Sequence, residues 1–165
     1  MQNQYKCSWC KGDNLYEKYH DTEWGVPVFD DQALFEFLTL ETFQAGLSWI
    51  TVLRKRPEFR KAFDQFNYHK ILHYNSQKEK ELMNNSSIIR NRLKISATIQ
   101  NANAFIEIQS KKGSFSNYLW EFVNGSPKIN VPVLNVILWK SHGRVWDFNF
   151  SKPSILFNHS FSFSV

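Results

Sequence analysis

The pattern of apolar and polar positions is helical over most of the chain. Leu34, Phe37 and Leu38 stand at positions i, i+3 and i+4, the spacing of one helix face. Asp30 and Asp31 precede them and offer an N-cap and a first-turn acid. We therefore predict an amphipathic helix that begins here. Helical patterns recur downstream, near residues 50–53, 77–83, 95–106 and 115–122.

Glu41 occupies the next position, i+7, on the apolar stripe of this predicted helix. A buried carboxylate without a partner is costly, so it needs a partner or a role. One interpretation is structural: the side chain lies at the edge of the stripe and reaches water or a backbone amide. The other is functional. Gly46 permits close approach of the backbone, and Trp49 adds a large flat ring, which together suggest a pocket for a flat, electron-poor ligand.

The character of the chain changes near residue 130. The last 35 residues include a single acid, Asp147, and stretches such as 145–150 and 161–165 alternate with period two. We expect an all-α domain over residues 1–130 and a divergent, non-helical tail over residues 131–165. The composition of this tail fits translation of a shifted reading frame, and we expect the tail to be poorly ordered.

The composition is that of a globular protein with an anionic partner. A chain of 165 residues with 42% hydrophobic residues can bury the core of one domain. The net charge of +5 and the pI near 9.2 favour nucleic acid. No apolar run approaches the roughly 18 residues of a membrane span, and the N-terminus does not resemble a signal peptide. We expect a cytoplasmic protein without a membrane partner.

Two cysteines and a histidine near the N-terminus are candidate metal ligands. In a reducing compartment Cys7 and Cys10 indicate free thiols or metal ligands before a disulfide. His20 is either a hydrogen-bonded structural residue or a further ligand, which Asp21 would orient. The pattern leaves both alternatives open, because a structural zinc site usually needs four protein ligands.

Basic residues gather in two places. Five of the eight residues from Arg54 to Lys61 are basic, and Pro57 within this run suits the first turn of a new helix. Three more cations lie between residues 90 and 94, beside apolar anchors. These residues are either solvated helix ends or contacts to nucleic-acid phosphates.

Four stretches resemble one known family. They are Tyr19–Pro27, Leu40–Leu53, Ile88–Ile95 and Gly113–Gly125. In this order they are similar to the type I DNA-3-methyladenine glycosylase family, and the resemblance covers about residues 7–128. It implies the all-helical fold of the helix-hairpin-helix glycosylase superfamily. It also implies hydrolysis of the bond between 3-methyladenine and deoxyribose, with double-stranded alkylated DNA and the free base as partners of a monomeric enzyme.

The resemblance also implies roles for individual residues. The base-contacting, catalytic acid falls on Glu41. The N-terminal ligands of a structural zinc fall on Cys7 and His20. The aromatic residues of the base pocket fall on Tyr16, Tyr19, Trp24 and Trp49, with Trp9 as a further candidate. We expect phosphate contacts from the basic residues Arg54, Lys55, Arg90, Arg92 and Lys94.

The C-terminal third departs from the family pattern. The resemblance implies a glycine-flanked hairpin that grips DNA, followed by a His and a Cys that complete the zinc site. No cysteine follows Cys10, and Gly143 is the one glycine after residue 130. A second hypothesis is therefore a non-catalytic remnant or nucleic-acid-binding module that keeps the base pocket. A third is a small metal-binding module built on Cys7, Cys10 and His20.

Overall fold

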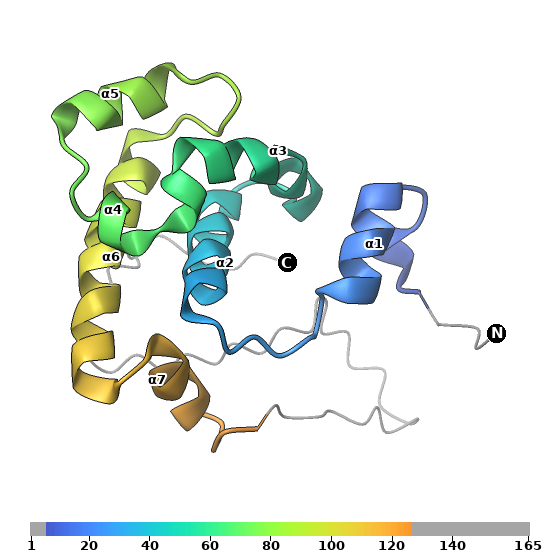
Figure 1. The fold of residues 1–165 in the computed structure, drawn as a ribbon. Coiled ribbons are helices and arrows are strands. Elements are labelled where there is room, and N and C mark those ends of the chain that lie inside the picture. The colour runs from blue at the N-terminus through green and yellow to red at the C-terminus, as the bar shows by residue number, and fades with distance from the viewer. Residues whose placement is uncertain (1–5, 127–165) are drawn as a thin grey trace.

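The computed structural model describes residues 6–126, which form helices and connecting loops and contain no strand (Figure 1). The elements are η1 (Ser8–Cys10), α1 (Asn14–Thr22), α2 (Asp31–Gln44), α3 (Trp49–Ala62), η2 (Asp64–Phe66), α4 (Tyr68–Ile71), α5 (Ser76–Asn84), α6 (Arg92–Lys112) and α7 (Phe115–Glu121). The predicted all-α class is confirmed for this part of the chain. The predicted tail over residues 131–165 lies outside it.

Helix α2 is the centre of the domain, with α3, α6, α7 and η2 all in contact with it (Figure 1). The predicted cap is confirmed, because the Asp30 side chain accepts a hydrogen bond of 2.8 Å from the amide of Ala33. The predicted single stripe is wrong in part, since Phe37 and Leu38 are only half-buried. Contacts on several sides bury a wider surface of the helix, which includes Leu34, Phe35, Thr39, Leu40 and Phe43.

Asp31 joins the first turn of α2 to the start of α7. Its carboxylate accepts hydrogen bonds from the amides of Phe115 at 3.0 Å and Ser116 at 2.8 Å. These amides lie in the first turn of α7, where backbone donors lack partners within the helix. The side-chain amide of Gln109 donates a third hydrogen bond, of 2.5 Å, to the same carboxylate. One acidic side chain thus connects α2, α6 and α7.

Helix α3 continues through Pro57, so the prediction that this proline opens a new helix is wrong. The cost is one backbone hydrogen bond and a steric conflict with the preceding turn. Both halves of the helix stay in place because each buries apolar side chains: Val52 and Leu53 before the proline, and Phe59 after it. None of the described helices combines the length and apolar composition that a membrane span requires.

A left-handed turn follows α3. Asp64, Gln65 and Phe66 have φ angles of 50°, 58° and 57°, a region that L-residues seldom occupy. Phe66 is fully buried, and the hydroxyl of Tyr74 donates a hydrogen bond of 2.6 Å to the Asp64 carboxylate. Burial and this hydrogen bond raise the pKa of Tyr74, so it remains a donor. These tertiary contacts keep the turn in its strained conformation.

Gln65→Gly is expected to raise the free energy of unfolding by about 0.5–1 kcal/mol, because glycine adopts positive φ without the cost that glutamine incurs. Gln65 is exposed and its carbonyl, which accepts from Gln32, is retained. Urea unfolding of the full chain measures the effect. Gln100→Gly, at an exposed interior position of α6, is the control and should cost about 1 kcal/mol. Similar losses from both variants would contradict the assignment of strain to this turn.

Candidate functional site

Five aromatic side chains from four separate segments form a continuous group, which we name the aromatic cluster: Trp9, Tyr16, Tyr19, Trp24 and Trp49. The ring of Trp9 lies 4.7 Å from that of Tyr16 and 5.4 Å from that of Trp24, between ring centroids. The centroids of Tyr19 and Trp49 are 5.5 Å apart. The cluster therefore joins η1 and α1 to the first residue of α3 and contains every aromatic residue predicted for the base pocket.

The local sequence fixes the α1 part of the cluster. The Asp13 carboxylate accepts from the amides of Leu15 and Tyr16, both at 3.0 Å, and so caps α1. At the other end, the carbonyl of Tyr19 accepts from the amides of residues 23 and 24, both at 2.9 Å. Gly25, with a φ of 76°, then turns the chain. Trp24 then packs against Trp9 at the edge of α1.

Glu41 and Trp49 flank the turn between α2 and α3. Glu41 lies in the last turn of α2 and is half-buried. This exposure agrees with both interpretations of the residue, the structural and the functional one. Trp49 is the first residue of α3, and 5% of its surface is exposed. Gly46 in the connecting turn has a φ of 78°, which favours glycine. The turn thus determines where the carboxylate lies relative to the indole and the rest of the aromatic cluster.

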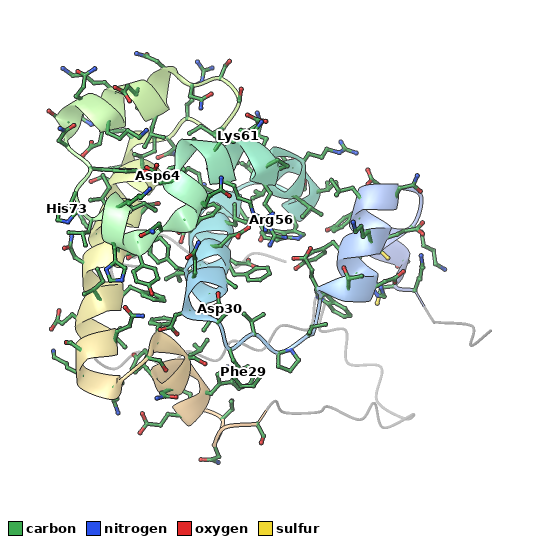
Figure 2. All side chains as sticks on the ribbon, viewed as in Figure 1. Phe29, Asp30, Arg56, Lys61, Asp64 and His73 are labelled. Carbon is green, nitrogen blue, oxygen red and sulfur yellow. The ribbon has the colours of Figure 1, made fainter. Side chains whose placement is uncertain are left out.

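A buried group of charges supports this region, and the sequence did not predict it. The guanidinium of Arg56 donates to the carboxylates of Glu36 and Glu23, each at 2.5 Å, and Arg60 adds a hydrogen bond of 2.9 Å to Glu36. Figure 2 shows Arg56 between α3 and α2. Because Glu23 directly precedes Trp24, these pairs connect the aromatic cluster to the core.

One signal in the sequence does point to this group. Arg56 is spaced four residues from Val52 and three from Phe59, so it falls on the buried face of α3. Only 11% of its side chain is exposed, and its guanidinium lies 5.1 Å from the centre of the Phe37 ring. Arg56 is therefore neither of the two kinds of cation predicted for residues 54–61, a solvated helix end or a phosphate contact.

The two predicted zinc ligands lie close together. The amide of Cys7 donates a hydrogen bond of 3.4 Å to Nε2 of His20, and Nδ1 of the same ring lies 2.9 Å from the Asp21 carboxylate. Asp21 thus takes the orienting position that the sequence suggested. Cys10 is fully buried, and burial raises the pKa of its thiol, which disfavours the thiolate that binds metals.

The fit to zinc is partial. Within residues 6–126 no group of three or more His, Cys, Asp or Glu side chains is arranged to hold a metal ion. Cys7 and His20 would supply two of the four ligands of a structural zinc. When bound, such a zinc would hold η1 against α1, where the described chain already has the contact between Cys7 and His20.

Zinc binding by this chain is expected to be weak. The two ligands found among the described residues fill half of a tetrahedral site, so we expect the ion to be lost during dialysis against a chelator. Metal analysis of the dialysed chain checks this, with Cys7→Ser as the comparison for specific binding. One zinc per chain that survives the chelator, and that Cys7→Ser removes, would contradict the expectation.

The basic residues predicted to contact DNA occupy different environments. Arg54 forms an ion pair of 2.5 Å with Asp13, although 63% of its side chain stays exposed. Lys55 donates to the carbonyls of residues 86 and 87, and Lys94 donates to two carbonyls at the end of α2. Among the described residues, Arg90 and Arg92 are exposed and form no side-chain hydrogen bond or ion pair. DNA contact stays a prediction for all five.

Comparisons with known proteins identify relatives. A family model described as methyladenine glycosylase matches residues 9–136. The DNA-3-methyladenine glycosylase of Haemophilus influenzae is 44% identical over 137 residues, which are 82% of this chain and 74% of the relative. DNA-3-methyladenine glycosylase 1 of Escherichia coli is 44% identical over 124 residues, which are 75% of this chain and 66% of the relative.

Solved structures give the same result. A crystal structure of 3-methyladenine DNA glycosylase I has a TM-score of 0.74 and 45% identity, and the match covers 76% of this chain and 69% of that one. A tyrosine-to-phenylalanine variant of 3-methyladenine DNA glycosylase I, in complex with 3-methyladenine, has a TM-score of 0.72 and 38% identity, with coverage of 74% and 66%. This chain therefore spans about two thirds of the length of several relatives. It belongs to the methyladenine glycosylase family.

Proposed function

We propose that this chain is a DNA N-glycosylase that hydrolyses the bond between 3-methyladenine and deoxyribose in alkylated DNA. Family membership supports the reaction. The observation that carries the proposal is the aromatic cluster, which ends at Trp49, one short turn away from Glu41. Aromatic faces and a carboxylate are the two groups that a flat cationic base would require.

The chemistry of the substrate explains why these groups suffice. Methylation at N3 makes adenine cationic and weakens its bond to C1′ of the sugar. Aromatic faces attract a cation, and a nearby carboxylate favours it further. Neutral adenine gains neither attraction, so selection arises from differential binding. The base has to leave the duplex to reach the cluster, and a damaged base costs less to unstack.

Each proposed residue then has a defined task. The rings of Tyr16, Trp24 and Trp49 stack on the extruded base or line its surroundings, while Glu41 accepts a hydrogen bond from it. The bond between C1′ and the base breaks with its electron pair on the base, which leaves as neutral 3-methyladenine. Water adds to C1′ and loses a proton, and the strand keeps an abasic sugar. The protein binds and orients, because the cationic leaving group already lowers the barrier.

The same proposal covers the compartment, the oligomeric state and the partners of the enzyme. We place the enzyme in the cytoplasm as a monomer on double-stranded alkylated DNA. The net charge of +5 supports an anionic partner, and Arg90 and Arg92, exposed and unpaired among the described residues, are available to contact phosphates. The proposal includes a structural zinc, for which Cys7 and His20 would supply two of the four ligands.

A second candidate is a module that keeps the base site without turnover. Two observations favour it. The match spans only 66% of the E. coli relative. The described residues hold two of the four expected zinc ligands. In such a chain the base site would bind free 3-methyladenine, while the grip on deformed DNA would be too weak for excision.

Release of free base from methylated duplex DNA separates the two candidates. The chain is compared with a chimera in which the C-terminal third of the H. influenzae relative follows residue 128, at equal folded concentration. We expect the chimera to release 3-methyladenine much faster than the chain itself. Equal rates would contradict our expectation for the C-terminal part, and no release by either protein would contradict the glycosylase assignment.

A further inference from the structure

Lys94 makes a contact that its sequence context does not suggest. It lies in the first turn of α6, and its ammonium reaches the C-terminal end of α2. There it donates hydrogen bonds of 2.9 Å to the carbonyl of Phe43 and 2.7 Å to the carbonyl of Ala45. A lysine expected to contact phosphate is thus bound to two backbone carbonyls, 51 and 49 residues away in sequence.

This contact occupies carbonyls that the helix cannot satisfy itself. The last carbonyls of an α-helix lack internal partners and carry the negative end of its dipole, which favours a cation. The carbonyl of Gln44, between the two, accepts a 2.6 Å hydrogen bond from the amide of Leu47. Lys94 and Leu47 together therefore satisfy three successive carbonyls and close the end of α2.

The lysine itself is held firmly. Its amide donates to the side chain of Asn91, the N-cap of α6, at 3.1 Å, and its carbonyl accepts from the Thr98 hydroxyl at 2.9 Å. The side chain is half-buried, and burial lowers the pKa of the ammonium. Phe43 at the other end is fully buried and packs its ring 4.7 Å from Phe59. Both ends of the contact are anchored in the core.

The contact lies at the turn that connects Glu41 to Trp49 in the proposed site. The turn at residues 45–48 begins at one of the two bonded carbonyls and ends immediately before Trp49. Glu41 lies one turn before the same carbonyls. We propose that Lys94 is a positioning residue, which fixes this turn and thereby the placement of the Glu41 carboxylate relative to Trp49. The inference rests on the proposed function, because it concerns the capture of 3-methyladenine.

Three variants of the full chain test the inference. Lys94→Met keeps an unbranched apolar stem and removes the donors, and Lys94→Arg restores a cation with several donors. Lys80→Met is the matched control, since Lys80 is an exposed lysine on α5. The first readout is amide hydrogen exchange at residues 45–48. The second is the affinity for free 3-methyladenine by calorimetry, well below the unfolding temperature. The third is the salt dependence of binding to unmodified duplex DNA.

For Lys94→Met we expect exchange in the turn to accelerate about tenfold and the base to bind about tenfold more weakly, because two hydrogen bonds from a charged donor no longer anchor the turn and part of that loss reaches the base site. Lys94→Arg should recover most of both properties, and Lys80→Met should match the original chain. The slope of DNA affinity against salt should not change. This pattern would support a positioning role.

Other outcomes overturn it. If base affinity and exchange stay unchanged while the salt slope falls by about one, Lys94 is a phosphate contact, as the sequence suggested. If exchange accelerates but base affinity is unchanged, the contact is a helix cap without influence on the site. If the unaltered chain binds no 3-methyladenine, the proposed function fails. Hydrogen exchange then tests the role of Lys94 by itself, and an unchanged exchange rate in Lys94→Met would show that Lys94 does not fix the turn.

Discussion

Replacement of Arg56 by methionine is expected to lower the free energy of unfolding by about 3–5 kcal/mol, the usual cost of removing one partner from a buried ion pair. Two carboxylates depend on this guanidinium, at 2.5 Å each, and only 11% of the Glu36 side chain is exposed. Methionine fills part of the volume but leaves Glu36 with Arg60 alone and Glu23 without its partner. Chemical unfolding with urea measures the loss.

Two further variants make this result specific. Lys61→Met removes a cation from the outer side of the same helix, where 70% of its side chain is exposed, and should change stability by less than about 0.5 kcal/mol (Figure 2). Arg56→Met combined with Glu36→Leu should recover part of the loss, because an apolar pair replaces a buried charge. A loss of equal size from Arg56→Met and Lys61→Met would show that Arg56 is no more important than a surface cation.

Glu41→Gln is expected to weaken the binding of free 3-methyladenine by about 1.5–3 kcal/mol while the fold stays intact, because an uncharged amide replaces a charge-assisted acceptor. Glutamine has the same shape, so the half-buried position accommodates it. Calorimetry on the folded variant gives the affinity, and circular dichroism verifies the fold.

Glu81→Gln is the matched control for this substitution. Glu81 is an exposed residue of α5, with 56% of its side chain in solvent, and the same chemical change there should leave base affinity unaltered. If Glu41→Gln binds the base as tightly as this control, the carboxylate has no part in recognition. The structural interpretation of Glu41, a side chain at the edge of an apolar stripe, would then be the correct one.

Local signals in the sequence predicted local features well. The aspartate at position 30 predicted the start of α2, because a helix cap depends on residues a few positions apart. The predicted pocket aromatics do meet in one cluster. Their residues followed from the family resemblance, whereas spacing within the chain relates only Tyr16 to Tyr19, three residues apart on α1.

Contacts between distant helices could not be predicted in this way. The partners of Arg56 lie 20 and 33 residues away, and those of Lys94 about 50. No periodicity indicates which carbonyl or carboxylate a long basic side chain will reach. The left-handed turn at Gln65 was missed for a similar reason, since buried neighbours and not the residues themselves impose its φ angle of 58°.

The most direct test of the base site compares 3-methyladenine with adenine. Both are titrated into the folded chain by calorimetry, a measurement that needs neither DNA nor a DNA-gripping hairpin. Free 3-methyladenine is neutral, but its ring is more basic and more polarised than that of adenine, so the aromatic cluster and Glu41 still favour it. We predict that it binds at least about tenfold more tightly than adenine, a difference of about 1.4 kcal/mol. Equal affinity for the two bases, or no binding of 3-methyladenine, would contradict the proposal that this cluster selects the alkylated base.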